Sequence, residues 1–360
     1  MRNAIEIGDH MPAVEIRSYC GDFEDVAELM GRVWMPEYRG RLWVPIPDAA
    51  YLRWRFGPES RAVCSAAYEG TKLVGTIFSA PSPLLISGSV YPASLSSVFT
   101  VDPDHRRIAL PLVQHLRRSN EERGIAITTG MVLGDPTSIS YRFWTKYAET
   151  FPENFRFLFR GSYLAKFLSP QVMAQSGIRA WERVASRAFG PLLGAIPFGY
   201  DQHVRPYRAE DLEQCVQILD KSSAGIDFAL VWPPDDLSYL LSNPTSGTLV
   251  FERGNRVLGL AHYHLLMMQG RDPVQSALLD LWADDHLAGS DRMRFVAHLC
   301  RFLRDAGVHA VVAPRCAMMP QTALLANLFV PVSDEFYIGV HMTPGGVAPS
   351  TPRSWSLVLT

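Results

Sequence analysis

Along the first half of the chain, hydrophobic and polar residues alternate in some segments, as in strands, and recur at helical spacing in others. Residues 14–19 (VEIRSY) alternate as a strand does, and apolar residues then recur at helical spacing after Asp22, which can cap a helix. Two alternating runs, 62–70 and 71–80, meet at a turn and predict a β-hairpin. The elements expected next are a strand at 93–101, an amphipathic helix at 108–124, a strand at 125–132, a helix at about 138–147 and strand-like sequence at 155–168.

The second half of the chain repeats this order of elements. Matching residues stay at nearly constant offsets: 188 residues between Tyr19 and Tyr207, 184 between Gly75 and Gly259, and 183 between Gly124 and Gly307. Three matches in the same order indicate an internal duplication. We therefore expect two domains, at 14–168 and 203–346, joined by a linker helix within 169–202.

The predicted linker helix has two different stripes. Pro170 can begin it and Gly190 can end it. One stripe is apolar (Ile178, Trp181, Val184, Ala188) and the other is basic (Arg179, Arg183, Arg187). The simpler interpretation is a structural helix with a solvated basic face. The alternative is a docking site for an acidic partner such as a carrier protein.

Composition narrows the class of protein. The chain has 360 residues with 48% hydrophobic and 19% charged content, which suits large buried cores. The formal net charge of -2 gives no electrostatic reason to expect a nucleic-acid partner. Five scattered cysteines form neither a metal motif nor an even disulfide set. Glu6 and Asp9 interrupt the N-terminal segment, which therefore lacks the apolar core of a signal peptide. No apolar run approaches the ~20 residues that span a bilayer. We therefore expect a cytoplasmic protein.

The segment after the strand at 93–101 resembles a phosphate-binding loop. In TVDPDHRRIAL, Val101, Pro103 and Arg106 match the V-x-P-x-x-R pattern of the GNAT (GCN5-related N-acetyltransferase) superfamily. The order of elements also resembles that family over most of the chain. The resemblance implies an α/β (α+β in some schemes) architecture of two tandem GNAT-like domains, each a mixed, mostly antiparallel sheet flanked by helices.

This loop departs from the family pattern at two positions. Ala109 and Pro111 stand where glycines normally bring backbone N–H groups to a pyrophosphate. In one registration Pro111 lies in the loop and donates nothing. In the preferred registration the loop is two residues shorter and Pro111 lies in the first helical turn. The helix then buries Ile108, Leu112, Val113 and Leu116.

The resemblance implies a donor site in the first copy, for acyl-CoA or an acyl-carrier protein, and no metal. Arg106 and Arg107 would supply positive charge at the phosphates. The second copy has Asp284, Asp285 and Asp291 in the equivalent loop, and these would repel a pyrophosphate. The expected donor-binding residues are Phe99, Thr100, Val101, Arg106, Arg107, Ile108, Ala109, Leu110, Thr137 and Trp144.

Three catalytic candidates follow, each with a structural alternative. The family helix N-x-x-A-x-x-F-Y-x-K matches the end of 137–146, with Trp144 in place of the tyrosine that protonates the thiolate in many relatives. Tyr141, one turn earlier, is a substitute acid or an ordinary half-buried tyrosine. Asp135 is a general base or a turn or cap residue. Ser97 orients water or is a plain strand residue.

The second copy adds a possible acceptor contact. His262 and His264 lie on one face of a predicted strand, and Asp280 is a charge within an apolar strand. Structural histidines are the simpler interpretation, with acid/base or acceptor contact and metal binding as alternatives. Six aromatic residues between Trp34 and Phe56 either cover an acceptor cleft or fill the core.

The function implied by the resemblance is N-acylation. An acyl group would pass directly from the thioester to the amine of a small molecule, amino acid or peptide. A non-catalytic GNAT-like binding or scaffold protein is the alternative.

Overall fold

The first half of the chain forms the predicted elements in the predicted order. The computed structural model describes residues 14–57, 60–343 and 348–358. Its first half contains β1 (Val14–Ser18), α1 (Phe23–Tyr38), β3 (Val63–Glu69), β4 (Lys72–Pro81), β7 (Ala93–Val101), α3 (Ala109–Glu122), β8 (Ile127–Leu133), α4 (Ile139–Thr150) and β9 (Phe155–Phe167). A short η2 (Pro103–Ile108) precedes α3. The additions to the basic pattern are β2 (Val44–Ile46), α2 (Ala49–Phe56), β5 (Leu84–Ile86) and β6 (Ser89–Tyr91).

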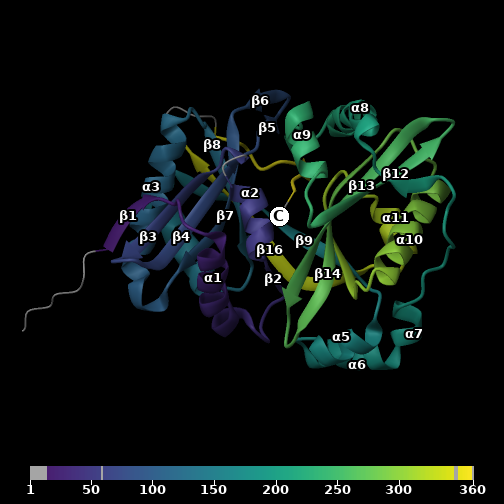
Figure 1. The fold of residues 1–360 in the computed structure, drawn as a ribbon, viewed down its shortest axis with the longest axis horizontal. Helices are drawn as coiled ribbons and strands as arrows, with labels where there is room; N and C mark the ends of the chain where they lie inside the picture. The colour runs from purple at the N-terminus through teal and green to yellow at the C-terminus, as the bar shows by residue number, and fades with distance from the viewer. Residues whose placement is uncertain (1–13, 58–59, 344–347, 359–360) are drawn as a thin grey trace, which may run out of the picture.

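The second half repeats the arrangement (Figure 1). It contains β10 (Val204–Pro206), η3 (Ala209–Asp211), α8 (Leu212–Ser223), β12 (Ser246–Arg253), β13 (Arg256–Gln269), β14 (Pro273–Asp284), α10 (Gly289–Asp305), β15 (Ala310–Pro314), α11 (Gln321–Ala326) and β16 (Val330–Met342). It also adds β11 (Phe228–Leu230), α9 (Pro234–Leu241) and β17 (Trp355–Ser356). The predicted α/β class and the predicted repeat of element order are therefore confirmed.

One continuous sheet runs through both halves. Its strand order is β1-β3-β4-β7-β8-β16-β9-β15-β14-β13-β12-β10, with β2 added on β13. β16, from the end of the chain, lies between β8 and β9 of the first half. β9 in turn pairs with β15 of the second half. Because each half contains a strand from the other, the boundaries at 168 and 203 stay predictions.

The glycines that revealed the repeat have the same packing role in both halves. A Cβ at Gly75 on β4 would lie 2.8 Å from Leu112 Cδ1 of α3. A Cβ at Gly259 on β13 would lie 2.9 Å from Leu287 Cδ1, just before α10. A larger residue at either position would push the loop-helix unit away from the sheet. The constant offset between Gly75 and Gly259 therefore reflects the same close approach of the loop-helix unit to the sheet in both halves.

The segment between the halves forms three short helices where one was expected: α5 (Pro170–Ser176), α6 (Ala180–Ala188) and α7 (Gly190–Leu193). They lie together at the lower edge of the molecule in Figure 1. Arg183 turns inward and donates to the carbonyls of Gly177 and Ile178 at 3.0 and 2.9 Å. The apolar stripe through Trp181 and Val184 is exposed instead. No helix within the described part of the chain is long and apolar enough to cross a membrane.

Candidate active site

A gap opens between the two parallel strands at the centre of the first half. β7 and β8 pair only where Ala93–Ser96 meets Ile127–Gly130. Beyond Ser96 the two strands separate, while β7 stays paired with β4 on its other side. The separated stretch of β7 is Ser97 to Val101, and it includes Phe99 to Val101, which the family resemblance assigned to the donor. A groove for an extended ligand can therefore form between β7 and β8.

A β-bulge lies at the start of this gap. Thr76 pairs with Thr100 and Phe78 pairs with Ser97, so two residues of β7 (Val98 and Phe99) face one of β4. Val98 has a φ of 57°, a region that β-branched residues avoid. Holding it there costs about 1–3 kcal/mol, and such strain concentrates at functional sites. The bulge removes backbone groups of β7 from the ladder with β4.

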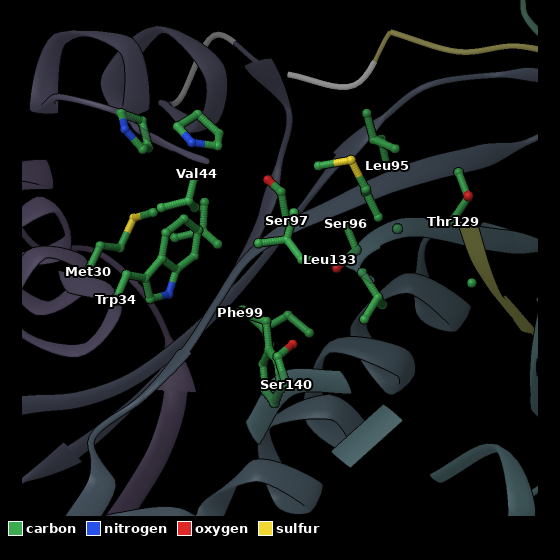
Figure 2. Close-up of a pocket in the computed structure, with 18 of the residues that line it drawn as sticks. Met30, Trp34, Val44, Leu95, Ser96, Ser97, Phe99, Thr129, Leu133 and Ser140 are labelled. Atoms are coloured by element: carbon green, nitrogen blue, oxygen red, sulfur yellow. The ribbon is translucent and has the colours of Figure 1, made fainter. Parts of the chain in front are cut away.

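A cavity of about 290 Å³ passes through this region (Figure 2). An engineered apolar cavity of roughly 150 Å³ holds a benzene molecule, so this one holds a considerably larger group. The first half contributes α1, β2, β7, α3, β8 and α4 to its walls. The second half contributes Leu265, Leu266, Met267, Gln275 and Leu278, and β16 contributes Gly339 and His341. The second copy thus forms part of the cavity wall.

Three residues predicted for the site meet at this cavity. The donor residues Phe99 and Trp144 line it, together with the catalytic candidate Ser97. Trp144 is buried with its ring centroid 5.3 Å from that of Phe99 and 5.0 Å from that of Phe155. Thr100 and Val101 continue β7 away from the cavity toward η2. These residues therefore form a continuous track from the cavity to the loop.

The loop at the end of β7 adopts the preferred registration. α3 begins at Ala109, which places Pro111 in its first turn and buries Leu112. Ile108 and Ala109 are buried and Leu110 is half-buried. Arg106 and Arg107 are exposed at the helix N-terminus, and within the described residues neither takes part in an ion pair. Positive charge is thus available where a helix N-terminus favours anions.

Three other predicted residues do not line the cavity. Asp135 accepts hydrogen bonds from the Thr137 amide at 2.9 Å and from Arg41 at 2.7 Å. Burial favours its neutral acid, but these hydrogen bonds outweigh burial and lower the carboxyl pKa. Tyr141 packs against Tyr337, with ring centroids 5.4 Å apart. Burial and that neighbour raise the pKa of the Tyr141 phenol. Asp135 and Thr137 thus form a turn anchored by Arg41.

The equivalent loop of the second copy is occupied by its own ion pairs. Asp284 pairs with Arg292 at 2.6 Å, and Asp291 pairs with Arg253 at 3.2 Å. Asp285 pairs with Lys221 at 3.0 Å and also with Arg256. Three carboxylates at the helix entrance leave no anion site there. This favours the first copy as the donor site.

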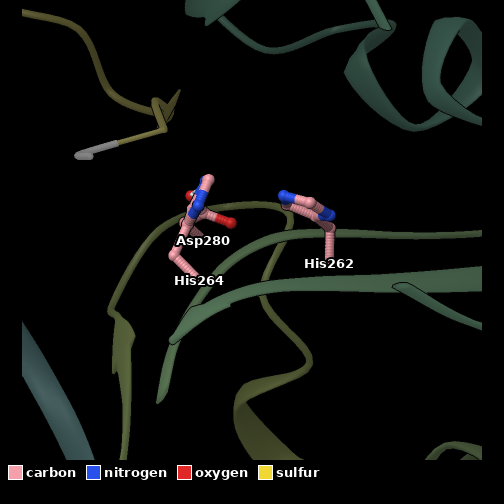
Figure 3. A group of neighbouring side chains, drawn as sticks. All are labelled: His262, His264 and Asp280. Carbon is pink, nitrogen blue, oxygen red and sulfur yellow. Dashed lines mark ion pairs between the residues drawn. The ribbon is translucent and has the colours of Figure 1, made fainter. Parts of the chain in front are cut away.

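The polar cluster of the second copy is assembled from two strands (Figure 3). His262 and His264 project from β13, and Asp280 projects from β14. All three are fully or almost fully buried. His264 Nε2 lies 3.1 Å from Asp280 Oδ2, and His262 Nδ1 lies 2.8 Å from Thr248 Oγ1. Burial, reinforced by His264 and opposed by Asp280, lowers the pKa of His262 to about 3.

Sequence patterns missed one deep wall of the cavity. Arg117 and Asn120 of α3, Thr128 of β8 and His341 of β16 line it. Asn120 donates to Thr128 Oγ1 at 2.9 Å, which ties α3 to β8. Burial, aided by Arg117, lowers the pKa of His341 to about 3. Asn120 was detectable as a polar residue on the apolar helix face, whereas His341 reaches the site only through the exchanged strand.

Among the comparisons with known proteins, only the comparison with solved structures finds matches. No protein-family model matches the chain, and no curated protein sequence matches it. Solved structures of N-myristoyltransferase from Saccharomyces cerevisiae with bound myristoyl-CoA match with a TM-score of 0.72 at 12% identity, covering 95% of this chain and 84% of that one. A GCN5-related N-acetyltransferase from Anabaena variabilis matches at 0.53 and 11% identity, over 92% of this chain and 73% of that one. A probable N-acyltransferase from Enterococcus faecalis matches at 0.51 and 9%, over 92% and 72%. The chain therefore has a tandem GNAT fold.

Proposed function

We propose that this chain, which has the tandem GNAT fold, is an N-acyltransferase that passes an acyl group from acyl-CoA directly to an amine. The observation that carries the proposal is the cavity that passes through the gap between β7 and β8, beside the bulge at Val98. An acyl-carrier protein that presents the same pantetheine thioester is the alternative donor. The S. cerevisiae enzyme with the same fold was solved with myristoyl-CoA, which supports a thioester donor.

The donor would follow the track described above. Its pyrophosphate would lie at the N-terminus of α3 beside Arg106 and Arg107, and its pantetheine arm would run along Phe99 to Val101. The thioester would then reach the bulge at Val98. There, backbone N–H groups freed from the ladder can donate to the oxygen that becomes negatively charged during attack.

The acyl chain would occupy the cavity. Most of its walls are apolar side chains, including Val113, Leu116 and Leu95. An acetyl group alone would leave most of the 290 Å³ unfilled. We therefore propose a medium- or long-chain acyl donor, whose methylenes each contribute ~0.8 kcal/mol on leaving water.

Transfer needs no covalent enzyme intermediate. The neutral amine nitrogen attacks the thioester carbon, the C–S bond breaks, and the proton that the nitrogen loses is taken up by the departing thiolate. Holding thioester and amine together can supply on the order of 7–11 kcal/mol of the barrier at best. Arg41, Asp135 and Thr137 would serve this arrangement indirectly, by fixing the end of β8.

The donor site is tested by removing its charge. The double variant Arg106→Ala/Arg107→Ala should weaken CoA binding at least tenfold in calorimetry, about 1.4 kcal/mol. Arg118→Ala, an exposed arginine further along α3, is the matched control and should bind CoA as the unmodified chain does. Equal CoA affinity in all three proteins would contradict the assignment.

The reaction is tested by intact-mass analysis. The protein is incubated with acetyl-CoA or longer acyl-CoAs and a panel of amines, amino acids and peptides. A mass increase equal to the acyl group, together with release of free CoA, is expected for at least one amine. Tight CoA binding without acyl transfer to any amine would instead favour the non-catalytic binding protein.

A further inference from the structure

The cavity proposed for the acyl chain contains a basic side chain. Asp48 and Arg117 are the two residues with charged side chains among the described residues that line it. Arg117 lies on the face of α3 that packs on the sheet, where Val113 and Asn120 are buried, and 27% of its side chain is exposed. A guanidinium keeps its charge at every physiological pH, and a charge beside apolar walls is usually paired. An anion is therefore expected beside Arg117.

The protein supplies only a loose partner for this cation. Arg117 Nε lies 3.7 Å from Glu121 Oε1, one turn further along α3. That separation is too long for a hydrogen bond, and neither atom has a hydrogen-bond partner among the described residues. Ion pairs of this kind within one helix are weak, because both side chains remain partly solvated. The guanidinium therefore has donors that a ligand in the cavity can use.

A second polar group of the same wall is also unsatisfied. His341 of β16 is the register partner of Thr128 of β8, so it shares a face of the sheet with Thr128, to which Asn120 donates. Neither ring nitrogen of His341 has a hydrogen-bond partner within the described part of the chain. Burial, aided by the charge of Arg117, lowers the pKa of His341 to about 3. The wall thus combines a cation with a neutral imidazole.

Strand pairing places this wall beyond the bulge. His341 pairs with Thr128 of β8, and Thr128 pairs with Ser94 of β7. Ser94 lies four residues before the bulge residue Val98, about 13 Å along the strand. The donor would enter from the other end of β7, at Val101. Its acyl chain, and not its pantetheine arm, would therefore reach this wall.

Charge and geometry favour a carboxylate at the end of that chain. A methyl group against Arg117 would remove water from the guanidinium without replacing its hydrogen bonds, which weakens binding. A carboxylate replaces them, because the planar fork of guanidinium N–H groups matches its two oxygens. A neutral imidazole such as that of His341 has one further N–H to donate.

We infer that the acyl group carries a carboxylate at its far end, bound by Arg117 beside His341, so that the donor is a dicarboxylic acid joined to CoA through one of its ends. This inference rests on the proposed function. Transfer breaks only the thioester, so the amide product keeps the second carboxylate and its negative charge. Arg106 and Arg107 would hold the pyrophosphate, whereas Arg117 would select the acyl group.

Matched thioesters test the inference without requiring turnover. Suberoyl-CoA and octanoyl-CoA have equal numbers of carbons and differ in the carboxylate at the far end. Calorimetry in the absence of an amine should show at least tenfold tighter binding of suberoyl-CoA. The thioester of 8-hydroxyoctanoic acid, which is polar but uncharged at that end, should bind at least tenfold more weakly than suberoyl-CoA.

Substitutions on α3 assign the preference to one residue. Arg117→Met removes the charge and keeps a long side chain, so the preference for suberoyl-CoA should disappear while the affinity for free CoA stays unchanged. Unchanged CoA affinity also reports an intact donor track. Arg118→Met changes the next residue, which is exposed, and should keep the full preference as the matched control. Arg117→Lys keeps a charge without the planar fork and should retain a weaker preference.

Three binding results would overturn the inference. The first is octanoyl-CoA binding as tightly as suberoyl-CoA to the unmodified protein. The second is equal binding of suberoyl-CoA and the 8-hydroxyoctanoyl thioester, because charge would then play no part. The third is a loss of free-CoA affinity in Arg117→Met as large as the loss for suberoyl-CoA, which would place Arg117 against the pantetheine arm.

Transfer to amines separates this inference from the proposed function. Acyl transfer from octanoyl-CoA, without any preference for suberoyl-CoA, would overturn the inference and leave the function standing. A preference for suberoyl-CoA that depends on Arg117, without transfer from any donor to any amine, would support the carboxylate site and contradict the function.

Discussion

The dependence of turnover on acyl-chain length tests the proposed site most directly. If the cavity of about 290 Å³ receives the chain, each added methylene leaves water as it binds. At ~0.8 kcal/mol per methylene, kcat/KM should rise about fourfold per carbon. The rise should stop once the chain fills the cavity.

Replacing Val113 by phenylalanine should shorten that range. Val113 lies on α3, is 2% exposed and lines the cavity, so the larger ring can occupy part of the empty space. If the ring displaces roughly two to four methylenes, the loss is ~1.6–3.2 kcal/mol. For the longest chains kcat/KM should then fall roughly 10- to 200-fold. Acetyl-CoA, which does not reach that wall, should be used as before.

The assay measures CoA release with a thiol reagent, from acetyl-CoA to palmitoyl-CoA, at a saturating amine concentration. CoA affinity and circular dichroism verify that Val113→Phe is folded. A flat chain-length profile in the unmodified protein would refute the idea that the cavity holds the acyl chain. Equal losses for acetyl-CoA and palmitoyl-CoA in the variant would refute it as well.

Three further predictions concern stability. Burial holds the pKa of His341 at about 3, so the folded state binds fewer protons than the unfolded chain below pH ~6.5. The free energy of unfolding should therefore fall as the pH drops from about 6.5 toward 3, by up to ~1.4 kcal/mol per pH unit. In urea unfolding at pH 7, 6 and 5, His341→Asn should lose less stability per pH unit than the unmodified chain. An equal loss in both proteins would contradict this. In Gly75→Ala the new Cβ would lie 2.8 Å from Leu112 Cδ1, so the free energy of unfolding measured in urea should fall by ~1–3 kcal/mol. Gly31 in α1 has open space around it, so Gly31→Ala should raise the free energy of unfolding by up to ~1 kcal/mol. Equal effects of the two substitutions would refute the packing argument. Lys166→Met removes an ammonium that donates to two carbonyls at and after α7, one of them at 2.7 Å, so hydrogen exchange should accelerate in residues 190–196 and stay unchanged in β9 if the contact anchors that segment.

Local sequence patterns identified most helices and strands. Each of these elements buries one face, and the spacing of the buried apolar residues is set within the element itself. The strand at 93–101 and the helix that buries Leu112, Val113 and Leu116 both formed as predicted. The registration that places Pro111 in the first helical turn was also correct. For these elements the spacing of neighbouring residues was enough to predict both the type of element and its buried face.

Long-range pairing could not be read in the same way. Nothing in the residues of β16 indicates that it lies between β8 and β9, because the partner of a strand is set by the assembled sheet. The deep cavity wall at His341 was missed for that reason. The outward apolar stripe of α6 was missed because a periodic pattern reveals an amphipathic helix without revealing which face meets solvent.

The exchange of β9 and β16 has a consequence for how the protein is made. When β9 leaves the ribosome, the neighbour that belongs between it and β8 lies 163 residues later, from Phe167 to Val330. At roughly 5–20 residues per second, that wait is on the order of ten seconds or more. During this time two strands of the nascent first half have open edges that could pair wrongly. A ribosome-bound chaperone that shields these edges would therefore raise the yield of correctly assembled protein. Severing the gene between the halves would give two fragments that fold only together.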